Sequence, residues 1–273
     1  MVGLWPQPLG LNGRLHRTSQ KDDIAVRLQL MTWSEVENYL QTSKTIIVPI
    51  GSTEQHGPIG LIGTDAICPE VVADLASKKN GILIGPTISV GMAQHHLAFP
   101  GSIALRPSTL IAVIRDYVLS LARNGFDRFY FLNGHGGNIA TVGAAFSEIY
   151  SETSFERNTQ RPHIRCKLAN WFGFPEVNEL CRELYKDRDG RHATASEVAV
   201  TQYAFPDHIK KAEMQDAQPA PRAFCDAEDY RKLFPDGRIE ADSFLATPDH
   251  GERLARLSAD CVVHDLTEFM DAS

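Results

Sequence analysis

Two short runs of core-type residues, Thr45–Ile50 and residues 128–132, each end directly in a polar cluster that contains glycine. The first run is rich in β-branched side chains and the second in aromatic ones, and both compositions favour β-strands. Stretches typical of helices follow each cluster, after residues 51–57 and 133–138. Strand, polar loop and helix in repeated succession indicate a parallel sheet covered by helices. We therefore predict an α/β fold, a three-layer α/β/α sandwich with a mainly parallel sheet.

The clearest helix is expected at residues 109–124, with Ser108 as its N-cap and Gly125 just beyond its end. Its apolar residues recur at the spacing of one helical face: Leu110, Val113, Ile114, Tyr117 and Leu121. Further strands are expected at residues 82–86 and 164–171, and further helices at residues 32–41, 66–79, 139–150, 193–204 and 251–270.

A chain of 273 residues can form one large α/β domain, which we place at residues 32–273. Residues 1–31 are rich in Gly, Pro and Arg and show little periodicity, so we expect a flexible N-terminal extension. Residues 212–249 lack the periodicity of a second domain and are expected to form an ordered surface excursion.

The net charge of -7 argues against a nucleic-acid-binding protein and against docking on an anionic membrane surface. No apolar run approaches the roughly 20 residues that a membrane span needs. The five cysteines are odd in number and form no CxxC pair, which argues against a disulfide framework or a Cys-based zinc site. Scattered cysteines suit a reducing compartment, so we expect a cytoplasmic protein.

Four side chains that can bind metal lie near the two polar clusters. Glu54 and His56 point to the same side of an extended segment, Asp65 comes nine residues after His56, and His135 follows the second strand. In parallel sheets ligands bind beyond the carboxyl ends of the strands, where these clusters lie. Carboxylate and imidazole without thiolate suit Zn²⁺ or Mn²⁺. Taken singly, Asp65 also fits a helix N-cap, and each histidine also fits a hydrogen-bonded loop residue.

Five blocks of the chain resemble the creatininase (creatinine amidohydrolase) family, in the same order, over about residues 32–270. The first reads Ile-Gly-Ser-Thr-Glu-Gln-His-Gly-Pro at residues 50–58, with Gly-Thr-Asp at residues 63–65. The others are His-Leu-Ala-Phe-Pro-Gly-Ser-Ile at 96–103, Asn-Gly-His-Gly-Gly-Asn at 133–138, His-Ala followed by Glu at 192–197, and Thr-Pro-Asp-His-Gly at 247–251.

The resemblance implies two divalent metal ions, Zn²⁺ and/or Mn²⁺. Glu54 and His135 would hold one ion and His56 the other, with Asp65 bridging them. Creatininase itself has a glutamate where this chain has Gly137, so Glu197 is the expected remaining carboxylate ligand.

The implied reaction is hydrolysis of a non-peptide or cyclic amide C–N bond by a metal-bridging hydroxide. His192 is the expected proton donor to the leaving nitrogen, because histidine titrates near neutral pH. Three further residues are expected to bind or position the substrate, His95, His96 and Asp189. The resemblance also implies a small-molecule amide substrate and a homo-oligomer, with a hexamer expected.

Two departures argue against creatinine itself as the substrate. Arg188 stands where creatininase has a tryptophan, and Gly136 replaces a bulky residue. A pocket that loses aromatic walls and gains a cation favours a larger or anionic substrate, and the family includes enzymes that cut formamides and peptide ends. Two other functions fit the same fold and ligands, a metal-dependent phosphoesterase and a binding protein that has lost its chemistry.

Overall fold

The computed structural model describes residues 24–155, 163–217 and 224–271. Its centre is a sheet of four strands in the order β2-β1-β3-β4. Every pairing in it is parallel. The strands are β1 (Thr45–Ile50), β2 (Leu83–Ile84), β3 (Arg128–Asn133) and β4 (Arg165–Asn170). The predicted α/β class with a parallel sheet is confirmed.

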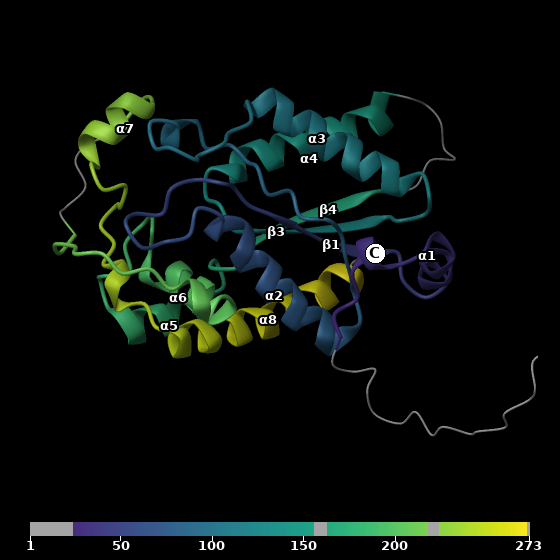
Figure 1. Ribbon diagram of the computed structural model, residues 1–273. Coiled ribbons are helices and arrows are strands. Elements are labelled where there is room, and N and C mark those ends of the chain that lie inside the picture. Colours follow the sequence, from purple (N-terminus) through teal and green to yellow (C-terminus); the bar gives the residue numbers. More distant parts are fainter. Residues whose placement is uncertain (1–23, 156–162, 218–223, 272–273) are drawn as a thin grey trace, which may run out of the picture.

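Helices cover both faces of the sheet, which makes three layers (Figure 1). Helices α3 (Pro107–Ala122) and α4 (Asn138–Phe155) lie on one face, and α2 (Thr64–Asn80) and α8 (Pro248–Asp271) lie on the other. Successive side chains of a strand point to opposite faces. Ile46 and Val48 of β1 accordingly pack with α3 and α4, whereas Ile47 packs with α2 and α8.

The remaining helices lie at the ends of this sandwich. Helix α1 (Trp33–Leu40) is capped by Thr32 and agrees closely with the helix predicted at residues 32–41. Helix α6 (Ala195–Ala204) packs on α8, and α7 (Ala227–Leu233) lies beside the short turn Gln94–His96. Helix α5 (Pro175–Tyr185) was not predicted from the sequence. Of the described helices, none is long and apolar enough to cross a membrane.

Two details of α3 differ from the prediction. The helix begins at Pro107 with Arg106 as N-cap, because proline suits the first helical position and has no N–H to satisfy. Its buried side chains are Leu110, Ile114, Val118 and Ala122, a narrower stripe than predicted.

Part of the predicted N-terminal extension is packed on the domain, whereas residues 1–23 lie outside the described residues. The Val26 N–H donates to Ser77 Oγ at 3.0 Å, and Arg27 pairs with Asp74 at 2.6 Å. Arg27 also forms a parallel bridge to Ile84 beside β2. Residues 24–31 are therefore part of the folded domain, not a flexible extension.

The strand register brings the two polar clusters together. Ile50 at the end of β1 pairs with Asn133 at the end of β3, so the loops that follow start side by side. The first turn of α2 packs directly on both loops. A Cβ at Gly51 or Gly134 would lie 2.2 or 2.0 Å from the backbone oxygen of Asp65. Glycine at both positions therefore lets Asp65 lie between the two loops.

The segment 212–249 contributes to the interior as well as to the surface, which corrects the predicted surface excursion. Tyr230 is fully buried and Arg238 is nearly so. Ile239 forms an antiparallel bridge with His192. This segment therefore forms one wall of the region at the carboxyl ends of the strands.

Candidate metal centre

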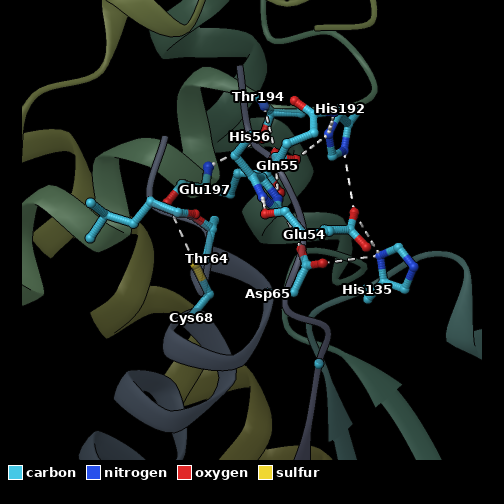
Figure 2. Close-up of polar contacts among 12 residues, drawn as sticks. Glu54, Gln55, His56, Thr64, Asp65, Cys68, His135, His192, Thr194 and Glu197 are labelled. Carbon is cyan, nitrogen blue, oxygen red and sulfur yellow. Dashed lines mark hydrogen bonds and ion pairs between the residues drawn. The ribbon is translucent and has the colours of Figure 1, made fainter. Parts of the chain in front are cut away.

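The five predicted metal ligands lie together beyond the carboxyl ends of β1 and β3 (Figure 2). Among the described residues, three groups of side chains have ligand atoms within 4.8 Å of one another: Glu54, Asp65 and His135; His56, Asp65 and Glu197; and Glu54, His56 and His192. The first two groups share Asp65, the residue expected to bridge two ions. The geometry thus allows the division of ligands that the sequence predicted.

Each histidine of the first two groups has one ring nitrogen held by the backbone. His56 Nδ1 lies 3.1 Å from the Glu54 carbonyl oxygen, and His135 Nε2 lies 2.9 Å from that of Met92. A carbonyl only accepts, so these nitrogens carry the protons. The other nitrogens face carboxylates, with His56 Nε2 and His135 Nδ1 each 3.1 Å from Asp65. Metal-binding histidines are oriented in this way in proteins.

The carboxylates at the centre lack the donors that buried anions normally require. Both oxygens of Glu54 and Oδ2 of Asp65 accept no hydrogen bond from the described residues. Glu54 is 0% exposed and Asp65 is 2% exposed. A buried, under-bonded carboxylate is costly unless it is paired or coordinates a cation. These oxygens and the two histidines therefore fit a bound divalent ion.

The pKa values show how strongly these groups interact. Burial, with help from Asp65, raises the pKa of Glu54 to about 7. Burial works to lower the pKa of His56, but Asp65 and Glu197 outweigh it and raise the value to about 10. The pKa of His135 rises to about 9, since Glu54 and Asp65 likewise outweigh burial. Without metal, the two protonated histidines are the cations that balance the carboxylates.

Glu197 has a local structural role as well as its place in the centre. It occupies the N3 position of a capping box, in which its Oε1 accepts from Thr194 N–H at 2.6 Å. Its Oε1 also lies 3.8 Å from His56 Nε2. Burial raises the pKa of Glu197 to about 7. The capping box thus fixes this carboxylate where it faces the His56 ring.

His192, the predicted proton donor, lies next to Glu54, with its Nδ1 3.7 Å from Glu54 Oε1. Burial and the neighbouring His56 and His96 rings hold its pKa well below the ordinary value, so the ring is neutral. The next residue, Ala193, has a left-handed backbone with φ 55. A non-glycine residue there is strained, and such strain is common at functional sites.

A pocket with a cavity volume of about 360 Å³ opens beside the centre. The three predicted substrate residues, His95, His96 and Asp189, all line it. Both ring nitrogens of His96 face protein groups, since Nε2 lies 3.1 Å from Glu54 Oε1 and Nδ1 contacts Gln55. The two carboxylate oxygens of Asp189 accept from Ser196, one from N–H at 2.8 Å and one from the hydroxyl at 2.9 Å. Of the three, only the His95 side chain makes no hydrogen bond to the described residues, so its ring is available to a substrate.

Arg188, the side chain predicted to add a positive charge to the pocket, lies outside it. Arg188 donates to Asp242 at 2.6 Å, pairs with Asp216 and lies over the Phe244 ring. It lines a separate, shallow hollow and is not among the described residues that line the pocket. Among the described residues that line the pocket, the one with a cationic lysine or arginine side chain is Arg191. This largely exposed side chain lies at the rim and pairs with Glu240 at 2.8 Å. The expectation that Arg188 adds a charge to the pocket was therefore wrong.

Comparison with known proteins identifies the family. The family model described as Creatininase, creatinine amidohydrolase, matches residues 29–266. The chain belongs to the creatininase family. The mycofactocin precursor peptide peptidase of Mycobacterium ulcerans (strain Agy99) is 32% identical over 120 residues, which is 41% of this chain and 48% of that protein. The chain thus spans about half the length of this first curated relative.

Two further members match over more of the chain. The creatinine amidohydrolase of Pseudomonas putida is 23% identical over 200 residues, covering 70% of this chain and 76% of that protein. A crystal structure of creatinine amidohydrolase (creatininase) superposes with a TM-score of 0.80 at 20% identity, covering 91% of this chain and 99% of that one. At that identity the likeness shows the shared fold alone.

Within this creatininase family member, two adjacent glycines differ sharply in their surroundings. A Cβ at Gly137 would lie 2.4 Å from His135 Nε2 and 2.8 Å from the Met92 carbonyl oxygen. A Cβ at Gly136 would meet nothing within 4 Å. A side chain at position 137 would therefore have to displace the His135 ring or the Met92 backbone, whereas the carboxylate of Glu197 lies 3.8 Å from His56 in addition to Asp65 at 3.1 Å.

Two residues that the sequence analysis did not single out touch the centre. The Gln55 side chain contacts both His96 and His192, and the Tyr230 ring packs against His96 with centroids 4.6 Å apart. Gln55 lies inside the first block that resembles the creatininase family, but alternation along an extended segment points its side chain away from those of Glu54 and His56. Tyr230 lies in a segment without periodicity, so no local pattern marked it.

Proposed function

We propose that this creatininase family member is a metal-dependent amide hydrolase that holds two divalent ions. One observation supports the proposal most strongly. The carboxylates of Glu54 and Asp65 are buried with oxygens that accept no hydrogen bond, and they face His56 and His135 rings that are oriented by backbone carbonyls. A structural role alone would not require so many under-bonded charges in one place.

The proposed ligand sets are Glu54, Asp65 and His135 for one ion, and His56, Asp65 and Glu197 for the other. Their donors are oxygen and nitrogen, which suits Zn²⁺ or Mn²⁺. Cys68 lies near the centre, but its thiol is directed at the Glu197 backbone carbonyl at 3.5 Å, and it belongs to none of the ligand groups among the described residues.

Divalent ions held by these residues would polarise an amide carbonyl and make water nucleophilic at neutral pH. The protein residues then have two tasks. His192, neutral and directed at Glu54, moves a proton to the leaving nitrogen. The buried walls around Glu54 exclude other water, which strengthens the electrostatic interactions within the site.

We propose an amide substrate larger than creatinine. Gly136 leaves open space on one side of the pocket, and Trp171 and Phe172 supply an aromatic wall on another. Arg191 at the rim is the group that would contact an anionic part of the substrate. Because Arg188 lies outside the pocket, a preference for anions would depend on Arg191.

The test combines metal analysis with a substrate panel. The purified protein is stripped with a chelator, reloaded with Zn²⁺ or Mn²⁺, and assayed against cyclic amides, formamides, short peptides and a generic phosphoester. We expect two ions per chain and hydrolysis of an amide by the loaded protein, abolished in Glu54→Gln and unaffected in the exposed-surface control Gln41→Met. Turnover of the phosphoester alone, or bound metal with no turnover at all, would reject the proposal.

We also propose a cytoplasmic homo-oligomer, with a hexamer expected from the family. All five cysteines are free, which suits a reducing compartment. Sedimentation of the metal-loaded protein tests the assembly, since a monomer at micromolar concentration would contradict it.

A further inference from the structure

Gln55 lies between two proposed metal ligands in the chain, but its side chain points away from both. It is 8% exposed and contacts four groups, one in its own loop and three in other segments of the chain. Its Oε1 accepts from Gly57 N–H at 2.8 Å. Its Nε2 lies 3.0 Å from the Gly237 carbonyl oxygen, 3.0 Å from His96 Nδ1 and 2.9 Å from His192 Nε2.

Two backbone groups fix the orientation of this amide. Gly57 N–H can only donate and the Gly237 carbonyl can only accept. Exchange of the amide oxygen and nitrogen would place two donors face to face at Gly57 and two acceptors face to face at Gly237. The Gln55 NH₂ therefore points to Gly237, whose carbonyl oxygen also accepts from the Tyr230 hydroxyl at 2.8 Å.

The orientation of the amide determines the proton position on His96. Its Nδ1 faces the Gln55 NH₂, so this nitrogen must accept and carries no proton. A neutral ring then has its proton on Nε2, the atom that lies 3.1 Å from Glu54 Oε1. His96 thus carries its proton on the nitrogen that lies beside Glu54, a close contact that is not an aligned hydrogen bond.

The backbone of Gln55 determines the proton position on His192. His192 Nε2 lies 2.8 Å from the Gln55 carbonyl oxygen, which can only accept, so Nε2 carries the proton and donates it. The two amide protons of Gln55 are already used by Gly237 and His96. The unprotonated Nδ1 of His192 therefore points into the group formed with Glu54 and His56.

We propose that Gln55 is a positioning residue that sets the tautomers of His96 and His192. Its side chain holds His96 with the ring proton on Nε2, the nitrogen beside Glu54, and its backbone carbonyl holds His192 with a lone pair toward the centre. The catalytic part of this inference rests on the proposed amide hydrolysis. In that reaction, His192 Nδ1 takes a proton from the attacking water and passes it to the leaving nitrogen, while Nε2–H stays bonded to the Gln55 carbonyl.

Two variants separate this role from simple loop packing. Gln55→Glu keeps the size of the side chain but replaces the NH₂ donor with an acceptor, so His96 is expected to move its proton to Nδ1. Gln55→Met keeps the length and removes both donor and acceptor, so the His96 ring is expected to mix tautomers, whereas His192 keeps its Nε2–H form because the backbone carbonyl of residue 55 remains. Gln41→Met is the matched control, because Gln41 is exposed at the end of α1.

The experiment reads the tautomers directly by long-range ¹H–¹⁵N correlation on metal-free protein with ¹⁵N-labelled histidines. Signals are assigned with single histidine variants. In the parent protein and in Gln41→Met we expect His96 and His192 both as the Nε2–H form. A parent His192 with its proton on Nδ1, or Gln55 variants with unchanged tautomers, would overturn the proposal. The parent spectrum alone can do so, even if a Gln55 variant does not fold.

Kinetics supply the second readout. We expect both Gln55 variants to lower kcat about 10- to 100-fold while KM changes much less, as for other residues that orient a metal site from behind. A roughly 10- to 100-fold change in KM with an unchanged kcat would contradict a role in positioning His192. If the parent hydrolyses no amide, the proposed function fails, yet the tautomer measurement still decides the role of Gln55.

Discussion

Replacing Gly137 with alanine should damage the metal centre although it removes no proposed ligand. The added Cβ would lie 2.4 Å from His135 Nε2 and 2.8 Å from the Met92 carbonyl oxygen. These two atoms are joined by a hydrogen bond of 2.9 Å. The carbonyl belongs to the backbone and cannot rotate away, so the His135 ring must move. Overpacking of this kind costs about 1–3 kcal/mol of stability. Loss of the backbone bond that orients His135 should weaken metal binding about 10- to 100-fold.

The adjacent substitution Gly136→Ala is the control, because its Cβ would meet nothing within 4 Å. Both variants and the parent are titrated with Zn²⁺ after chelation, with metal affinity measured by competition against a chromophoric chelator and stability by urea unfolding. We expect Gly137→Ala to show both losses and Gly136→Ala to match the parent. Equal metal affinity in all three proteins would refute the packing argument and the assignment of His135.

Three further predictions follow from the pKa values and contacts. Because the pKa values of His56 and His135 are raised from 6.5 to about 10 and about 9, their protonated rings stabilise the metal-free fold below pH 6.5. That contribution is lost as pH rises through 9 to 10, whereas metal binds the deprotonated rings better. The increase in Tm that Zn²⁺ causes should therefore become larger between pH 6.5 and 9. An increase in Tm that becomes smaller over this range would contradict the prediction. Asp189→Ala should lower stability by about 1–3 kcal/mol in urea unfolding, since Ser196 loses both acceptors; a higher KM with unchanged stability would instead make Asp189 a substrate residue. Arg188→Ala should leave kcat and KM within about twofold of the parent, and a large rise in KM would place its cation in the pocket after all.

The sheet could be predicted because its signals are local. The β-branched run before Gly51 and the aromatic run before Asn133 each specify a strand, and the motifs place ligands just after them. Helix α5 was missed although its sequence carries the signal: Pro175 suits a helix start, and Val177, Leu180, Cys181, Leu184 and Tyr185 recur at the spacing of one helical face. The start of α3 was placed late because Ser108 is a good cap in isolation, whereas Pro107 already adopts the helical backbone.

The environment of the site could not be predicted in the same way, because it depends on contacts between distant segments. Nothing near Asp189 in the sequence shows that its oxygens are occupied by Ser196, or that Arg188 turns toward Asp242. The contact between Gly237 and the Gln55 amide joins residues that are far apart in the chain. Such contacts determine which polar side chains remain available to a substrate.

A crystal structure of the metal-loaded protein, with anomalous scattering recorded at the zinc and manganese edges, tests the two-ion proposal most directly. We predict two ions about 3.5–4 Å apart. Asp65 should contact both, Glu54 and His135 one of them, and His56 and Glu197 the other. A single ion, or a second ion that Glu197 does not contact, would contradict the proposed centre.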